Sequence, residues 1–126
     1  AAAYGSALPP VRKMPAAPPF VAATGNVAGT VRDAVRAAHG IFHGPLLTPA
    51  SRQALTTIRW PAEDYALGGR VRAIDGDPWA WGTGKVGGWR THIAHRLGRS
   101  ETVVVFNTTD MEQSVIGGWV EAIVLA

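Results

Sequence analysis

The sequence predicts an α+β fold, with an antiparallel sheet of about four strands, a C-terminal helix packed on it and two helices upstream. Two patterns predict it. Apolar residues recur at helical spacing before residue 58 and after residue 111, whereas residues 65–107 alternate and are interrupted by turn signals. No internal repeat is visible, and 126 residues correspond to about one small domain.

The two upstream helices are predicted over residues 30–43 and 49–58. Thr30 is a suitable N-cap, and the carboxylate of Asp33, three residues later, suits the positive end of a helix. A Gly-Pro pair at 44–45 ends this helix. A Thr-Pro pair at 48–49 begins the second helix, with threonine as its cap and proline at its first position.

The strands are predicted at residues 65–74, 79–84, 89–97 and 102–106. Asp75-Gly76 is a hairpin signal, and residues 98–100 form a second turn. Residues 111–124 follow as the closing helix, with its apolar positions on one face.

Residues 1–23 form a separate N-terminal region. They contain five prolines, which prevent regular structure and predict an extended arm that needs a surface to lie on. The domain itself is predicted over residues 24–126.

Composition excludes several classes of function. The net charge is +3 and the arginines are scattered, which does not favour a nucleic-acid partner. The absence of cysteine excludes disulfides, thiolate catalysis and cysteine-based zinc sites. No apolar run of about 18 residues exists, so no membrane span is predicted, and the N-terminus does not resemble a signal peptide.

The most unusual stretch is WAWGTGKVGGWRTHIAH, at residues 79–95. Its GTGKVG segment at 82–87 matches G-x-G-x-x-G, but that motif binds a dinucleotide only where the glycine loop opens a helix. Here the following residues are strand-like. A Walker loop also fails, because Trp79 stands at its first glycine and Val86 at its Ser/Thr. We therefore expect neither a nucleotide nor any other cofactor.

The histidines and tryptophans have ordinary structural interpretations too. His92 and His95 are three apart on a predicted strand and point to opposite faces, while His39 and His43 are four apart on a predicted helix. No carboxylate accompanies either pair, so no metal site is predicted. Trp79, Trp81 and Trp89 fit either a core or the wall of a cleft, and both interpretations stay open.

Residues 82–89, GTGKVGGW, resemble the third motif of class C β-lactamases and related esterases, which reads K-T-G-S-T-G-G-F, or H-T-G in many relatives. The similarity continues through the strand at 103–107 to the closing helix. Three upstream segments also resemble the family: residues 23–33 its A-A-G-G-L-x-S-T-x-x-D stretch, 44–51 its G-x-L-L-S-P-x-S, and 65–68 its Y-G-L-G. Together these cover about residues 20–125 in the right order.

The chain departs from the family at three places. None of its four serines is followed three residues later by lysine, so the nucleophilic S-x-x-K motif is absent. The second motif, Y-x-N or S-x-N, is absent as well. In the third motif, Gly82 stands where the family has lysine or histidine, and Lys85 lies three positions further along the strand.

The resemblance implies the C-terminal segment of a β-lactamase-like serine hydrolase, whose serine and lysine lie in a missing N-terminal segment or chain. It implies that the backbone N–H of Lys85 contributes to an oxyanion hole, and that substrate is bound by Gly82, Thr83, Gly84, Trp81 and Asn107. The substrate would be a small acyl compound (ester, amide or β-lactam), with acyl transfer to serine followed by hydrolysis. The family's usual compartment is periplasmic or extracellular.

Two alternatives remain. One is a non-catalytic penicillin-binding-like or scaffold module that uses the cleft only for binding, which Gly82 favours. The other is an independent small α+β binding domain whose likeness to the family is accidental.

Overall fold

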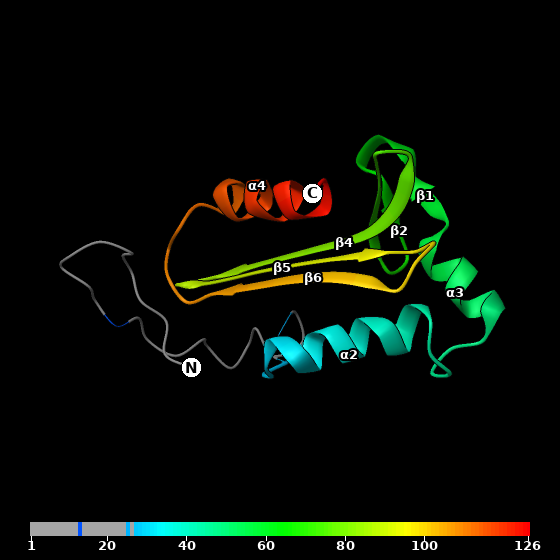
Figure 1. Ribbon diagram of the computed structural model, residues 1–126, viewed down its shortest axis with the longest axis horizontal. Helices are drawn as coiled ribbons and strands as arrows, with labels where there is room; N and C mark the ends of the chain where they lie inside the picture. The colour runs from blue at the N-terminus through cyan, green and yellow to red at the C-terminus, as the bar shows by residue number, and fades with distance from the viewer. Residues whose placement is uncertain (1–12, 14–24, 26) are drawn as a thin grey trace.

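The computed structural model describes residues 13, 25 and 27–126. It is an α+β arrangement in which one six-stranded antiparallel sheet lies between helices (Figure 1). The elements are α2 (Val31–Phe42), α3 (Pro49–Thr56), β1 (Ile58–Trp60), the 3₁₀ turn η2 (Pro61–Glu63), β2 (Tyr65–Ala66), β3 (Gly69–Ile74), β4 (Asp77–Val86), β5 (Trp89–Arg96), β6 (Glu101–Asn107) and α4 (Gln113–Val124).

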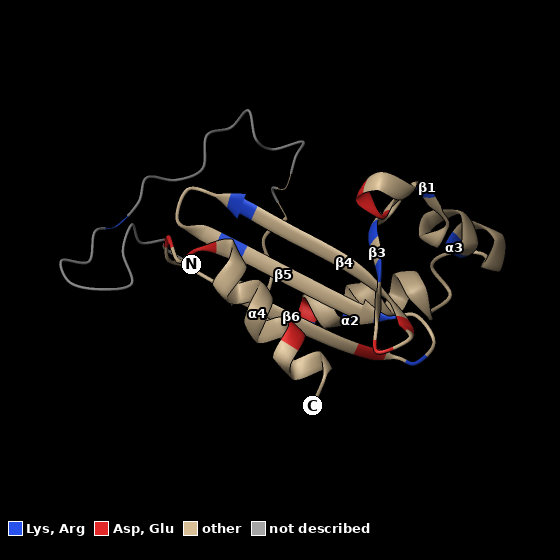
Figure 2. Ribbon diagram, turned by 90° about the horizontal axis from the view of Figure 1, so that it is seen from above, with Lys and Arg blue, Asp and Glu red and all other residues tan. Residues whose placement is uncertain are grey.

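The strands follow one another across the sheet in sequence order, so each pairs with the next along the chain. Helix α4 covers one face of β5 and β6, and α2 covers the opposite face (Figure 1). The helix α3 lies at the end of the sheet, beside β2 and β3. The result is a three-layer arrangement in which the turn of the long β4–β5 hairpin lies at the end of the molecule away from α3 (Figure 2).

Two tight turns set the register of the meander. Asp75 and Gly76 join β3 to β4 with φ values of 50° and 81°, which is the two-residue hairpin that their sequence predicts. Gly87, with φ 50°, opens the two-residue turn between Val86 and Trp89. Glycine suits this position because a side chain is strained at positive φ.

The largest apolar cluster lies under α4. Trp79 and Trp81 of β4, Ala94 of β5 and Val120 of α4 are buried together, and Ile116 of α4 is fully buried. The two tryptophans are therefore core residues, as strand alternation on one face requires.

The structure corrects several sequence-based boundaries. The predicted α+β class, with a C-terminal helix and two upstream helices, is confirmed. The sheet has six strands where about four were expected, because residues 58–60 form an edge strand and the predicted strand at 65–74 divides into two. The predicted strand at 65–74 is broken at Leu67-Gly68, where the Gly68 N–H donates to the Leu55 carbonyl of α3 at 3.0 Å. The predicted arm at 1–23 lies outside the described residues except for Lys13.

The capping box of α2 offers a first quantitative test. The Thr30 hydroxyl accepts from the Asp33 N–H at 3.2 Å, and the Asp33 carboxylate accepts from the Thr30 N–H at 2.9 Å. These bonds satisfy two otherwise free helix donors and lower the pKa of Asp33. We expect Thr30→Ala to reduce the free energy of unfolding by about 1 kcal/mol in urea titrations. Arg32→Ala, on the exposed surface of the same helix, is the control, and an equal loss there would rule out the cap as the cause.

Candidate functional site

The outer half of β4 forms a free sheet edge. Strand β3 pairs with β4 only from Asp77 to Trp81. Beyond Trp81, residues 82–86 pair with β5 and with no other described strand. The third-motif-like segment thus begins where β4 loses its partner on one side.

Backbone alternation identifies which groups face this free edge. The Pro78 carbonyl accepts from the Leu97 N–H at 2.9 Å and so faces β5. The Trp81 carbonyl faces the other way, toward β3, where a Cβ added to Gly69 would lie 3.6 Å from its oxygen. Since backbone direction alternates along a strand, the N–H and C=O groups of Thr83 and Lys85 point outward to the free edge.

The side chains of the same segment divide between the two faces. Trp81, Thr83 and Lys85 alternate onto the face that α4 covers further along, whereas Gly82 and Gly84 lie on the face of α2. A Cβ at Gly82 would meet nothing within 4 Å, but one at Gly84 would lie 2.5 Å from the Thr91 hydroxyl. Position 82 therefore has room for a side chain, while position 84 is restricted by its cross-strand neighbour.

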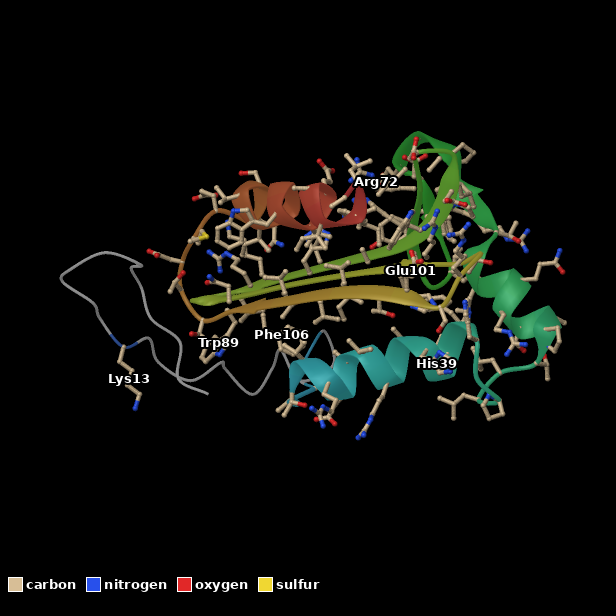
Figure 3. The ribbon with its side chains drawn as sticks, viewed as in Figure 1. Lys13, His39, Arg72, Trp89, Glu101 and Phe106 are labelled. Carbon is tan, nitrogen blue, oxygen red and sulfur yellow. The ribbon has the colours of Figure 1, made fainter. Side chains whose placement is uncertain are left out.

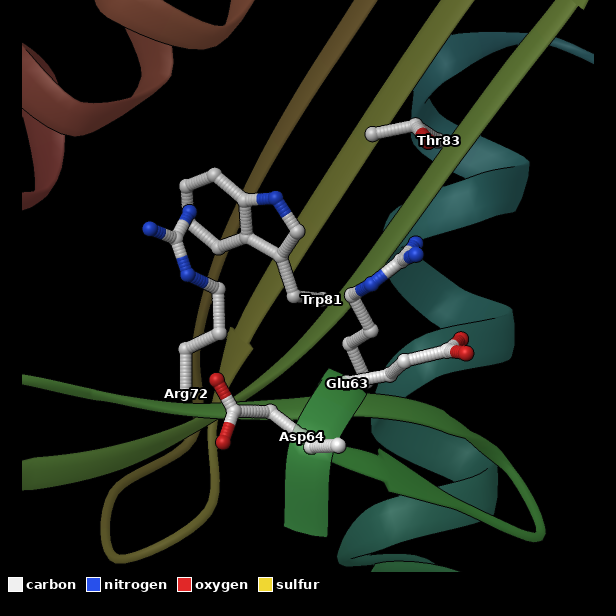
Figure 4. A pocket seen from close by; sticks show the side chains of 7 residues that line it. Glu63, Asp64, Arg72, Trp81 and Thr83 are labelled. Atoms are coloured by element: carbon white, nitrogen blue, oxygen red, sulfur yellow. The ribbon is translucent and has the colours of Figure 1, made fainter. Parts of the chain in front are cut away.

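A cavity of about 380 Å³ opens beside this edge (Figure 4). It lies where β3 and the η2 turn diverge from β4. Its lining residues are Ala62, Glu63, Asp64, Arg70, Arg72, Trp81 and Thr83.

The cavity combines both signs of charge with an aromatic wall. The Arg72 guanidinium lies 5.0 Å from the Trp81 ring centroid and 3.1 Å from the Glu121 carboxylate of α4. The Arg70 guanidinium lies 4.8 Å from the Tyr65 ring centroid. Among the described residues Arg70 forms no ion pair. Its positive charge in the cavity therefore has no protein carboxylate within ion-pair distance.

A residue that the sequence did not single out holds the far end of the segment. The Arg90 side chain is 4% exposed and donates to the carbonyls of Gly87 at 2.5 Å, Trp89 at 3.0 Å, Met111 at 3.1 Å and Asp110 at 3.5 Å. These hydrogen bonds connect the β4–β5 turn to the segment between β6 and α4. No feature of the sequence indicates this role, because the same face of β5 also carries Arg96, which pairs with carboxylates instead.

The structure brings most of the predicted site residues together. Gly82, Thr83, Gly84 and Lys85 are consecutive along the free edge, and Trp81 and Thr83 line the same cavity. Asn107 lies apart from them, because β5 separates its strand from β4. Its side-chain oxygen accepts from the Thr109 N–H at 2.7 Å, which is a turn-forming role at the end of β6.

The histidines lie on both faces of the sheet. His92 contacts Trp81 edge-on, with ring centroids 4.4 Å apart, and burial lowers its pKa. His95 faces the opposite way, toward α2, so the predicted opposite orientation of the two is confirmed. Within residues 27–126 and the two isolated described positions, no group of three metal-ligating side chains is placed to hold a metal ion.

Comparison with family models, with curated proteins and with solved structures finds no match to this chain. Over the described part of the chain, none of the helices has the length and apolar character needed to cross a bilayer.

Proposed function

We propose that the chain is the C-terminal segment of a β-lactamase-like serine hydrolase, in which β4 forms one wall of an acyl-transfer site. In this proposal a serine and lysine from an N-terminal segment lie against the free edge, and the Lys85 N–H donates to the oxyanion. A preorganised backbone donor of this kind contributes on the order of 3 kcal/mol to transition-state stabilisation.

The observation that carries the proposal is the loss of pairing on β4 at the start of the G-T-G segment. Proteins normally protect the unpaired backbone groups of a sheet edge, because such groups readily bind another chain. An unprotected edge is therefore a candidate binding surface. Here the outward N–H groups of Thr83 and Lys85 have no strand partner among the described residues. Thr83 also lines the cavity of about 380 Å³, and Lys85 lies two residues further along the same edge. Outward donors next to a cavity are the arrangement that an oxyanion site requires.

Exposed apolar side chains support a further segment packing on this chain. Helix α4 is apolar on both sides: Ile116 and Val120 face the sheet, while Trp119 is 46% exposed and Ile123 is 55% exposed. A helix that is hydrophobic all round is normally buried on all sides. We interpret the outer side of α4 as a surface for the rest of the hydrolase.

A non-catalytic binding module is the second candidate, and Gly82 favours it. Glycine supplies neither a charge nor a proton-carrying group where the resembled family has lysine or histidine. Under this alternative the cavity binds an acyl compound without forming an acyl-enzyme, and a serine-directed fluorophosphonate probe would label nothing associated with this chain.

Restoring the missing side chain tests the catalytic proposal. Gly82→His introduces a side chain on the face of α2, opposite the cavity that Trp81 and Thr83 line, at the position where the resembled family has lysine or histidine. A Cβ there meets nothing within 4 Å, so we expect the fold to be retained. In the native hydrolase we expect the rate of p-nitrophenyl ester hydrolysis to rise at least about tenfold, since positioned general acid–base groups typically contribute 10²–10⁴-fold.

Gly98→His is the matched control, because a Cβ at Gly98 also meets nothing within 4 Å and lies in a distant turn. An equal rate change in both variants, or none in Gly82→His with the fold intact, would argue against position 82 as a site for proton transfer.

A further inference from the structure

Three histidines from distant parts of the sequence meet where α2 lies against the sheet. His39 and His43 come from the C-terminal end of α2, and their ring centroids are 6.0 Å apart. His95 of β5 has its ring centroid 4.9 Å from that of His43. We call these three side chains the histidine joint. Figure 3 labels His39 at this end of α2.

Two rings of the joint, those of His39 and His95, also connect α2 to the sheet. His39 Nδ1 and the Ser100 hydroxyl form a hydrogen bond of 2.6 Å that links α2 to the β5–β6 turn. The His95 ring stacks on Phe42 of α2, with centroids 5.0 Å apart and planes at 21°, while its Nδ1 bonds the Thr102 hydroxyl at 2.7 Å.

At the centre of the joint the His95 ring is buried, whereas His43 is half-buried and His39 is exposed, and the joint lacks compensating negative charge among the described residues. His95 is fully buried, and within the described residues the Nε2 atoms of His43 and His95 are buried without a hydrogen-bond partner. No described carboxylate forms an ion pair with any of the three rings, and the cross-strand neighbour of His95 on β4 is Ala80. The carboxylate of Glu101, at the start of β6, is paired with Arg96. A proton added to His95 would therefore introduce an uncompensated buried charge.

We propose that the histidine joint is a proton-operated latch, in which protonation of His95 releases the C-terminal end of α2 from β5 and β6. The ring centroids of His95 and His43 are 4.9 Å apart, so a proton on His95 repels any positive charge on His43, and opening the joint separates and hydrates the two rings. Helix α2 covers β5 and β6 on the same sheet face as Gly82. Opening of the latch therefore uncovers that face of β5 and β6.

The direction of the pH response follows from His95. Burial, followed by the charges of His43 and His39, lowers the pKa of His95 from its usual 6.5 to about 4. Because the closed joint binds the proton more weakly than the open one, the closed state keeps its full advantage above pH 6.5. That advantage is lost as the pH falls from 6.5 toward 4.

Hydrogen exchange along α2 measures this opening. We expect the protection of α2 amides, corrected for the pH dependence of intrinsic exchange, to fall at least about tenfold between pH 6.5 and pH 4.5. His92 is also buried with a lowered pKa, but it lies on the opposite face beneath α4. Acid can therefore act on α4 through His92, so the internal reference is α3, which carries no histidine and contacts β2 and β3.

His95→Asn keeps a polar atom at the position of Nδ1 for the bond to Thr102 but cannot be protonated. We expect it to abolish the extra loss of protection in α2 relative to α3, and His43→Gln to reduce it. An unchanged pH response of α2 in both variants, or an equal loss across α2 and α3 in the unmodified chain, would overturn the latch.

Discussion

Replacing Arg90 with alanine is expected to reduce the free energy of unfolding by about 3–5 kcal/mol. The guanidinium is almost fully buried and donates to four backbone carbonyls from two different connections. Hydrogen bonds to a charged group typically contribute about 1.5–3 kcal/mol each, although such contributions do not add fully. Urea unfolding followed by far-UV circular dichroism measures the loss.

Two variants show whether the planar fork of Arg90 is the cause. Arg90→Lys keeps the charge but not the geometry that reaches several carbonyls, so we expect it to recover only a minor part of the stability. Arg70→Ala, on the same sheet but exposed, should cost less than about 1 kcal/mol. Similar losses in Arg70→Ala and Arg90→Ala would contradict the tethering role.

Trp81→Ala, made as a separate variant, is expected to reduce the free energy of unfolding by about 3–5 kcal/mol, because it removes a large side chain from the centre of the core. Trp81 is 7% exposed, contacts His92 edge-on and supports the Arg72 guanidinium at 5.0 Å. It also lines the cavity with Thr83, so its loss should disturb the candidate site as well as the core.

Trp119→Ala is the matched control for Trp81→Ala. The Trp119 side chain is 46% exposed on the outer side of α4, and we expect its removal from the isolated chain to cost less than about 1 kcal/mol. A larger loss for Trp119 than for Trp81 in thermal unfolding would contradict the assignment of the core to the sheet side of α4.

Much of the fold follows from local sequence signals. Thr30 with Asp33, Thr48 with Pro49 and the Asp75-Gly76 turn each specify a helix start or a hairpin, and each lies where it was expected. These signals act over a few residues, so they can be read without knowing the rest of the structure. The short strand β1 was missed because three residues carry no measurable periodicity. The break between β2 and β3 was missed because it depends on a hydrogen bond to α3.

The candidate site was only partly predictable. The run from Gly82 to Lys85 is contiguous in sequence, so its motif and its alternation were visible. The cavity, in contrast, depends on where β3 separates from β4. The histidine joint depends on contacts between residues far apart in the sequence, namely His39 with Ser100 and His43 with His95. The role of Arg90 was equally hidden, because its partners are backbone carbonyls and leave no trace in side-chain composition.

The most direct test of the central proposal is labelling of the natively purified protein with a fluorophosphonate and with a fluorescent penicillin, followed by intact-mass and peptide analysis. We predict one acylated serine, in an S-x-x-K motif, on a segment joined to this chain or copurifying with it. Recovery of a single folded species with the mass of this chain alone and no labelled serine would contradict the proposal that β4 is one wall of a serine hydrolase.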